Sequence, residues 1–151
     1  LPSARLRERA DRWNQVGGFR SRSMTRREIS TGTDWEEEFG YSRAVRIGDV
    51  IRVAGTVAVE DGDPVAPDDP YEQTAHVLET IGDALAELDA GPDDVLSTTV
   101  YVVDFDDWEP IGEAHKEFFD GARPATTLLE VASLPDPALR VEIQATAAVP
   151  S

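Results

Sequence analysis

The sequence predicts an α+β fold in which two helices pack on one face of a β-sheet. Two segments carry apolar residues at helical spacing, and strand-like runs lie before, between and after them. The predicted order is strand, strand, helix, strand, helix, strand, strand. This alternation is typical of a mixed sheet with its helices on one side. The 151 residues, 40% of them hydrophobic, suffice for one domain with its own core.

Residues 1–23 differ in composition from the rest of the chain. They hold six of the chain's 14 basic residues and end in Arg-Ser-Arg-Ser before Met24. We expect a poorly ordered basic extension, with a functional basic arm as the alternative. Residues 24–151 are then expected to form the single domain.

The first two predicted strands form a hairpin. Residues 41–46 alternate in polarity, Ile47-Gly48-Asp49 supplies a tight turn, and residues 50–57 return. Gly55 interrupts the second strand. A glycine there indicates either a bulge or a group that approaches the backbone closely.

The first predicted helix has clear start and stop signals. Asp69 can cap it, Pro70 suits its first position, and Ala90-Gly91-Pro92 ends it. Its apolar stripe is made of Leu78, Ile81, Leu85 and Leu88. The next run, residues 95–103, is rich in β-branched residues, which is typical of a strand buried on both faces.

The second predicted helix is capped by Asp106 or Asp107 and ends before Gly121. Its stripe is made of Trp108, Ile111, His115 and Phe118. Two strands close the chain. Residues 124–135 are apolar and β-rich, and residues 140–148 alternate polar with apolar side chains. Thr126 and Glu142 are the candidates for chemistry on these strands.

The chain is strongly acidic. It carries 30 acidic against 14 basic residues, a net charge of −16, and Lys116 is its only lysine. Nucleic acid is therefore an unfavourable partner, because affinity for phosphates comes from Lys and Arg. Such a surface also fits a halophilic protein, whose self-repulsion is screened in molar salt. An acidic surface adapted to dilute salt is the alternative.

Composition and motifs exclude several other classes. No run approaches the roughly 18 to 20 apolar residues of a membrane span, and nothing resembles a secretory signal, so we expect a cytoplasmic protein without a membrane partner. Without cysteine there is no disulfide, thiolate nucleophile or cysteine-ligated zinc. GxGxxG, P-loop, GxSxG and HExxH motifs are absent.

We expect no metal and no cofactor. His76 and His115 lie on different predicted helices, and a single histidine on an apolar stripe is more often a packed residue than a ligand. The acidic runs, such as Glu36-Glu37-Glu38, lie at loops and helix starts, where solvation and capping explain them.

Several segments together resemble the RidA family, the reactive intermediate deaminases also called YjgF or L-PSP. The C-terminal signature is PATTLLEVASLP at residues 124–135, followed by VEIQA at residues 141–145. Similar residues occur upstream at Tyr41-Ser42, Val53-x-Gly55, Gln73-Thr74, Asp94-Val95 and Phe118-Phe119. The resemblance covers residues 41–149.

The resemblance implies a chorismate-mutase-like fold and a homotrimer with ligand clefts between subunits. It also implies hydrolysis of short-lived enamines and imines to 2-keto acids and ammonia. In that reaction an Arg holds the substrate carboxylate, and a Glu positions or activates water. The Glu corresponds to Glu142, an aromatic cleft residue to Tyr41, and a glycine that admits close approach to Gly55. Leu128 belongs to the same expected binding set.

The Arg has no counterpart, because Thr126 occupies its position; Gly112 likewise replaces a cleft Asn. A neutral hydrogen bond contributes about 0.5 to 1.5 kcal/mol, whereas each charged bond of an Arg contributes about 1.5 to 3. Binding of a 2-imino acid should therefore be weaker. Arg123 and Arg140 could reach the cleft, or could belong to the surface or to ion pairs.

Three functions are compatible with these residues. The first is a trimer that binds, and could hydrolyse, small enamines, imines or related carbonyl compounds through Glu142, with altered specificity. The second is a trimer that binds or senses a small ligand without catalysis. The third, an L-PSP-type endoribonuclease, is disfavoured by the acidic composition.

Overall fold

The computed structural model describes residues 25–150. The predicted extension of residues 1–23 lies outside the described residues. The main sheet has six strands in the order β1-β2-β3-β8-β6-β7, and a two-stranded hairpin joins β4 to β5. The strands are β1 Arg26–Ile29, β2 Ala44–Ile47, β3 Val50–Val57, β4 Val59–Glu60, β5 Asp63–Pro64, β6 Val95–Val102, β7 Ala125–Glu130 and β8 Val141–Ala148.

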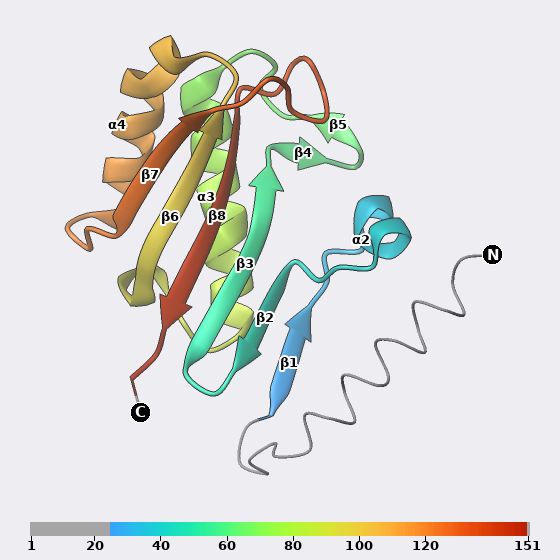
Figure 1. The fold of residues 1–151 in the computed structure, drawn as a ribbon, viewed down its shortest axis with the longest axis vertical. Coiled ribbons are helices and arrows are strands. Elements are labelled where there is room, and N and C mark those ends of the chain that lie inside the picture. The colour runs from blue at the N-terminus through green and yellow to red at the C-terminus, as the bar shows by residue number, and fades with distance from the viewer. Residues whose placement is uncertain (1–24, 151) are drawn as a thin grey trace.

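The described residues also form the α-helices α2 Asp34–Phe39, α3 Pro70–Glu87 and α4 Trp108–Phe119. Short 3-10 helices precede β6 and α4, at Pro92–Asp94 and Phe105–Asp107. The long helices α3 and α4 lie on the same face of the sheet, behind it in Figure 1. The predicted α+β class and the order of its two strands, helix, strand, helix and two strands are therefore confirmed.

The core lies between the sheet and the two long helices. The predicted stripe of α3 is fully buried there, at Leu78, Ile81, Leu85 and Leu88. Every second residue of β8 faces it, at Val141, Ile143, Ala145 and Ala147. The α3 start is also as predicted, because the Asp69 side chain accepts a hydrogen bond from the Glu72 N–H and Pro70 is the first residue of the helix.

Some predicted details of the elements are wrong. β6 is not buried on both faces: its burial alternates, and Leu96 is 58% exposed. Among residues 25–150 the long helices α3 and α4 cover one side of the sheet, so β-branched residues do not by themselves show two buried faces. In α4, Trp108 is 52% exposed and stands outside the buried stripe. Ile111, in the same first turn of α4, is buried in the core, so the helix begins on the core, and of these two side chains only that of Trp108 lies outside it.

The segment before the predicted hairpin holds two elements that the sequence analysis did not predict. β1 pairs antiparallel with β2 at the sheet edge, and α2 follows it. β2 begins at Ala44 rather than at Tyr41. Both added elements are short and lack an apolar period, so they depend on neighbours that are distant in the sequence.

Candidate functional site

Glu142 lies in the middle of the sheet, on the face opposite α3 and α4. It stands between the fully buried Val141 and Ile143, so its side chain points away from the core. In the register of the sheet it is flanked by Val57 of β3 and Tyr101 of β6. Burial raises the pKa of Glu142, and the charge of Arg43 opposes that rise. Such a carboxyl group is suited to exchange protons with a bound ligand.

Gly55 lies directly beside Glu142. A Cβ atom at residue 55 would be 2.6 Å from the Glu142 Oε1 atom. Between Val53 and Thr56 the register of β3 against β8 also shifts, as in a β-bulge. The sequence analysis offered a bulge and a close approach as alternatives for Gly55, and both occur.

Arg43 joins this group, although the sequence analysis did not select it. It is only 7% exposed. Its guanidinium donates hydrogen bonds to the Gly55 carbonyl at 2.8 Å and to the Thr56 hydroxyl at 3.0 Å. It also lies over the Tyr41 ring, 5.6 Å from its centroid, and 3.4 Å from the Tyr41 hydroxyl. Arg43 thus links the predicted residues Tyr41, Gly55 and Glu142.

Glu36 lies beside Arg43. Of the two explanations given for its acidic run, solvation and helix capping, solvation is wrong for this residue, whereas its N–H does bond to the helix cap Thr33. Glu36 is 5% exposed, and its Oε2 atom is 3.7 Å from the Arg43 guanidinium. Its carboxylate accepts hydrogen bonds from the Thr31 N–H and from the hydroxyls of Thr31 and Thr33. Burial alone would raise the pKa of Glu36, but these hydrogen bonds lower it to about 2.

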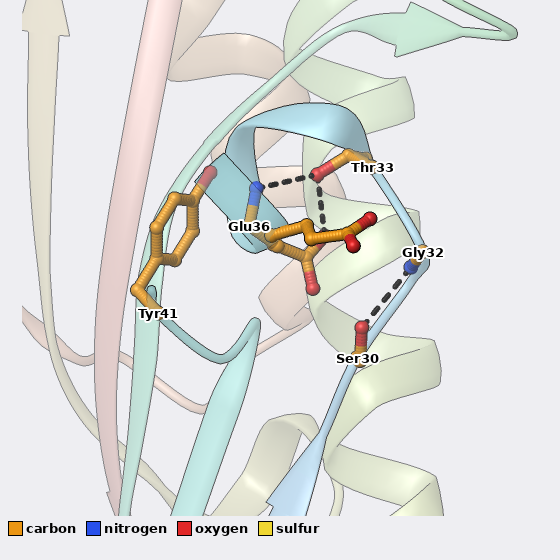
Figure 2. Close-up of a pocket in the computed structure, with 6 residues that line it drawn as sticks. Ser30, Gly32, Thr33, Glu36 and Tyr41 are labelled. Carbon is orange, nitrogen blue, oxygen red and sulfur yellow. Dashed lines mark hydrogen bonds between the residues drawn. The ribbon is translucent and has the colours of Figure 1, made fainter. Parts of the chain in front are cut away.

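A small pocket of about 330 Å³ opens beside Glu36. It is lined by Ser30, Gly32, Thr33, Glu36, Glu37 and Tyr41. Figure 2 shows that the Thr33 hydroxyl accepts a hydrogen bond from the Glu36 N–H and faces the Glu36 carboxylate. The Tyr41 ring lies on the opposite side of the pocket. The Glu36 carboxylate therefore stabilises the start of α2 and the residues just before it. Tyr41 connects this pocket to Arg43.

Thr126 belongs to a second cluster on the helix-covered side of the sheet. Its hydroxyl is 2.8 Å from the Thr98 hydroxyl of β6, which in turn is 2.9 Å from the His115 Nε2 atom of α4. Thr126 also donates to the Pro124 carbonyl at 3.1 Å. Burial lowers the pKa of His115, so this imidazole is neutral at pH 7.

The two clusters do not come together within one chain. Thr126 faces α4 across Thr98, whereas Glu142 faces the opposite side, and β6 lies between β7 and β8. The family resemblance implies ligand clefts between subunits, and that prediction does not require Thr126 and Glu142 of one chain to meet. Alternation along each strand puts them on opposite faces, so only a second copy of the chain could bring the two faces into one cleft.

The other predicted residues lie apart from Glu142. Leu128 is paired with Val100 and packs against the core, and Gly112 is exposed on α4. Arg123 is exposed just before β7. Arg140 is in an ion pair with Asp107 at 2.7 Å, as the ion-pair interpretation of this residue predicted.

Nothing in residues 25–150 groups three or more His, Cys, Asp or Glu side chains in a way that could hold a metal ion. None of the helices in these residues is long and apolar enough to cross a membrane.

Comparison with known proteins agrees with this architecture. The family profile described as "Endoribonuclease L-PSP" matches residues 33–149. An uncharacterised protein of Streptomyces coelicolor is 41% identical over 118 residues, 78% of this chain and 88% of that protein. The 2-iminobutanoate/2-iminopropanoate deaminase of Mus musculus is 31% identical over 126 residues, 83% of this chain and 93% of the deaminase.

Solved structures give the same result. The crystal structure of a YjgF-family member from Mycobacterium tuberculosis matches with a TM-score of 0.76 at 41% identity, covering 83% of this chain and 100% of that one. The fold that carries both side-chain clusters is therefore shared with a solved structure.

Proposed function

The chain belongs to the endoribonuclease L-PSP family, also called the YjgF or RidA family, and on that premise we propose that it is a cytoplasmic homotrimer that binds and hydrolyses small reactive enamines or imines with Glu142. The observation that carries this proposal is the half-buried Glu142 carboxyl group above Gly55, because burial raises its pKa toward the range useful for proton transfer. The deaminase name of a mouse relative supports the reaction type.

The proposed chemistry is the addition of water to a carbon–nitrogen double bond. The Glu142 carboxylate accepts a proton from water while the water oxygen bonds to the imine carbon, and the π electrons pass to nitrogen. The protonated carboxyl group then returns that proton to the nitrogen of the carbinolamine. The Glu142 carboxylate then takes the hydroxyl proton of the carbinolamine as the carbonyl forms and the carbon–nitrogen bond breaks, and it passes this second proton to the departing nitrogen, which leaves as ammonia. General acid and base catalysis of this kind typically contributes a factor of about 100 to 10,000.

We propose that the ligand cleft forms between copies of the chain. The family resemblance supports this assembly, and so does the uncovered face of the sheet, where the large side chains of Leu96 and Leu129 are 58% and 44% exposed. A neighbouring copy on this face would bury them and could place its Thr126 edge near Glu142.

Glu142→Gln tests the catalytic role. Imines are generated in situ by a threonine dehydratase, and ammonia release above the uncatalysed rate is measured. We expect at least about a 100-fold loss of kcat, because Gln can neither accept nor return the proton. Thr146→Ala, on the same strand, is the matched control and should retain wild-type activity. Activity in Glu142→Gln equal to wild type would refute the assignment of Glu142.

The non-catalytic alternative has one specific observation in its favour, the neutral Thr126 hydroxyl at the position where the resemblance expects an Arg. The same assay separates the two. A wild type that leaves imine lifetimes unchanged, together with a Thr126→Arg variant that gains activity, would indicate a binding protein. The endoribonuclease interpretation stays disfavoured, since a net charge of −16 repels a polyanion.

A further inference from the structure

We propose that this cleft selects imines without a carboxylate group, neutral or cationic, over 2-imino acids. The inference rests on the proposed function, because it concerns the ligand of the Glu142 site. Three independent features carry it: how the Thr126 proton is used, how the Arg43 charge is compensated, and the charge of the residues around Glu142.

The Thr126 hydroxyl is committed to bonds within the protein. With a proton on His115 Nε2, the imidazole donates to Thr98, Thr98 donates to Thr126, and Thr126 donates to the Pro124 carbonyl. With that nitrogen unprotonated, Thr98 donates to His115 and Thr126 donates to Thr98 or Pro124. Each arrangement uses the single Thr126 proton internally.

The Thr126 hydroxyl can therefore offer a ligand only an acceptor lone pair. It suits an N–H or O–H group of a ligand and is unfavourable toward a carboxylate, which has only acceptors. A carboxylate could bind only if the hydroxyl gave up its bond to Pro124. Burial keeps the His115 imidazole neutral, so the cluster adds no positive charge that would compensate.

Arg43 does not replace a missing anion-binding Arg. It is 7% exposed, donates to the Gly55 carbonyl and the Thr56 hydroxyl, and has the ionised Glu36 at 3.7 Å. Together Glu36, Arg43 and ionised Glu142 sum to a formal charge of −1. Such a site repels an anion and stabilises a protonated imine, the more electrophilic form, beside the Glu142 carboxylate.

One other cation lies near the Thr126 edge. Arg123 precedes β7 and is exposed. Its charge is partly screened by water and salt, so it should contribute little to recognition. If any cation near Thr126 binds a ligand carboxylate, it is Arg123, and the test below therefore includes the variant Arg123→Gln.

The test uses two imines with the same carbon skeleton apart from the carboxylate. A flavin amine oxidase acting on propylamine yields propan-1-imine, and a flavin amino-acid oxidase acting on 2-aminobutanoate yields 2-iminobutanoate, which adds only the carboxylate. The protein is assayed for acceleration of ammonia release from each. We expect kcat/KM to be at least about tenfold higher for propan-1-imine, because the net negative charge around Glu142 repels the carboxylate of 2-iminobutanoate.

Variants identify the cause of the preference. Thr126→Arg should lower or reverse the ratio, and Thr126→Val should lower it by less, because Val removes only the acceptor lone pair. Arg123→Gln should keep the ratio. A wild type faster on 2-iminobutanoate would overturn this inference while upholding the proposed hydrolysis. A loss of the 2-iminobutanoate rate in Arg123→Gln would overturn it too, by making Arg123 the anion site. If the protein accelerates the hydrolysis of neither imine, the proposed function is contradicted, and this inference is contradicted with it.

Discussion

Glu36 illustrates how the environment of one residue changes its meaning. In the sequence it is the first of three consecutive glutamates, and only the fold gives it three hydrogen-bond donors from Thr31 and Thr33 and an Arg43 neighbour. Thr33 and Glu36 have the spacing of a helix-capping pair, which is the signal that could have separated Glu36 from the two glutamates after it.

The Glu36 carboxylate should make the stability of the wild-type protein depend on pH in a defined way, and replacement of Glu36 should remove that dependence. The folded-state pKa of Glu36 is about 2, below the ordinary 4.5, so the ionised carboxylate stabilises the fold. This contribution, about 3 kcal/mol, is complete above pH 4.5 and is lost as the pH falls toward 2.

We therefore expect Glu36→Gln to reduce the free energy of unfolding by about 3 kcal/mol at pH 7, with a gap to wild type that closes between pH 4.5 and 2. Urea unfolding across that range measures it. Glu37→Gln, one residue along and exposed, is the control. A gap that does not change with pH would contradict the assigned role of the Glu36 charge.

Gly55 shows what a glycine within a predicted strand indicates about local structure and what it leaves open about distant contacts. A glycine inside a β-rich run indicated a bulge or a close contact, and that expectation needed only the local sequence. The partner of the contact, Glu142, lies far along the chain, on the neighbouring strand β8. No local pattern connects these two positions.

At the scale of elements, α3 organises the domain by more than its apolar stripe. Gln73 is fully buried in it and donates to the carbonyls of Ala66 and Ala138, while it accepts the Arg140 N–H at 2.7 Å. One side chain thus holds the loop before α3 and the segment that leads into β8. The placement of Glu142, just after Arg140, depends on that segment.

Gln73→Leu should destabilise the protein by about 1 to 3 kcal/mol, because the Arg140 N–H loses its acceptor and the carbonyls of Ala66 and Ala138 each lose one of their two donors. Glu79→Leu, on the exposed side of the same helix, should change stability by less than about 0.5 kcal/mol. Chemical unfolding of both variants measures the difference. Equal stability of Gln73→Leu and wild type would show that water replaces these bonds.

At the scale of the molecule, charge is the dominant feature. A net charge of −16 on 151 residues opposes folding through self-repulsion, which salt screens. We propose that the protein is halophilic, so that its structure is lost at low salt.

We expect the melting temperature to rise as KCl increases from about 0.05 M to about 1 M, where the Debye length has fallen to about 3 Å. Differential scanning calorimetry measures the shift, and sucrose in place of KCl controls for effects other than screening. The same melting temperature at both salt concentrations would contradict the halophilic interpretation.

The sequence by itself determined the fold class, the family and the identity of the central strands and helices. Those features depend on local periods, capping residues and a C-terminal signature that can be read along the chain. Glu142, Tyr41 and Gly55 could be selected in the same way.

Only the tertiary structure decided which of these residues are neighbours. It placed Arg43 between Tyr41 and Gly55, buried Glu36 beside it, and separated Thr126 from Glu142 on opposite faces of the sheet. The physical reason is that strand register and helix coverage are set by contacts between distant segments. A one-residue change in register would move every side chain of a strand to the other face.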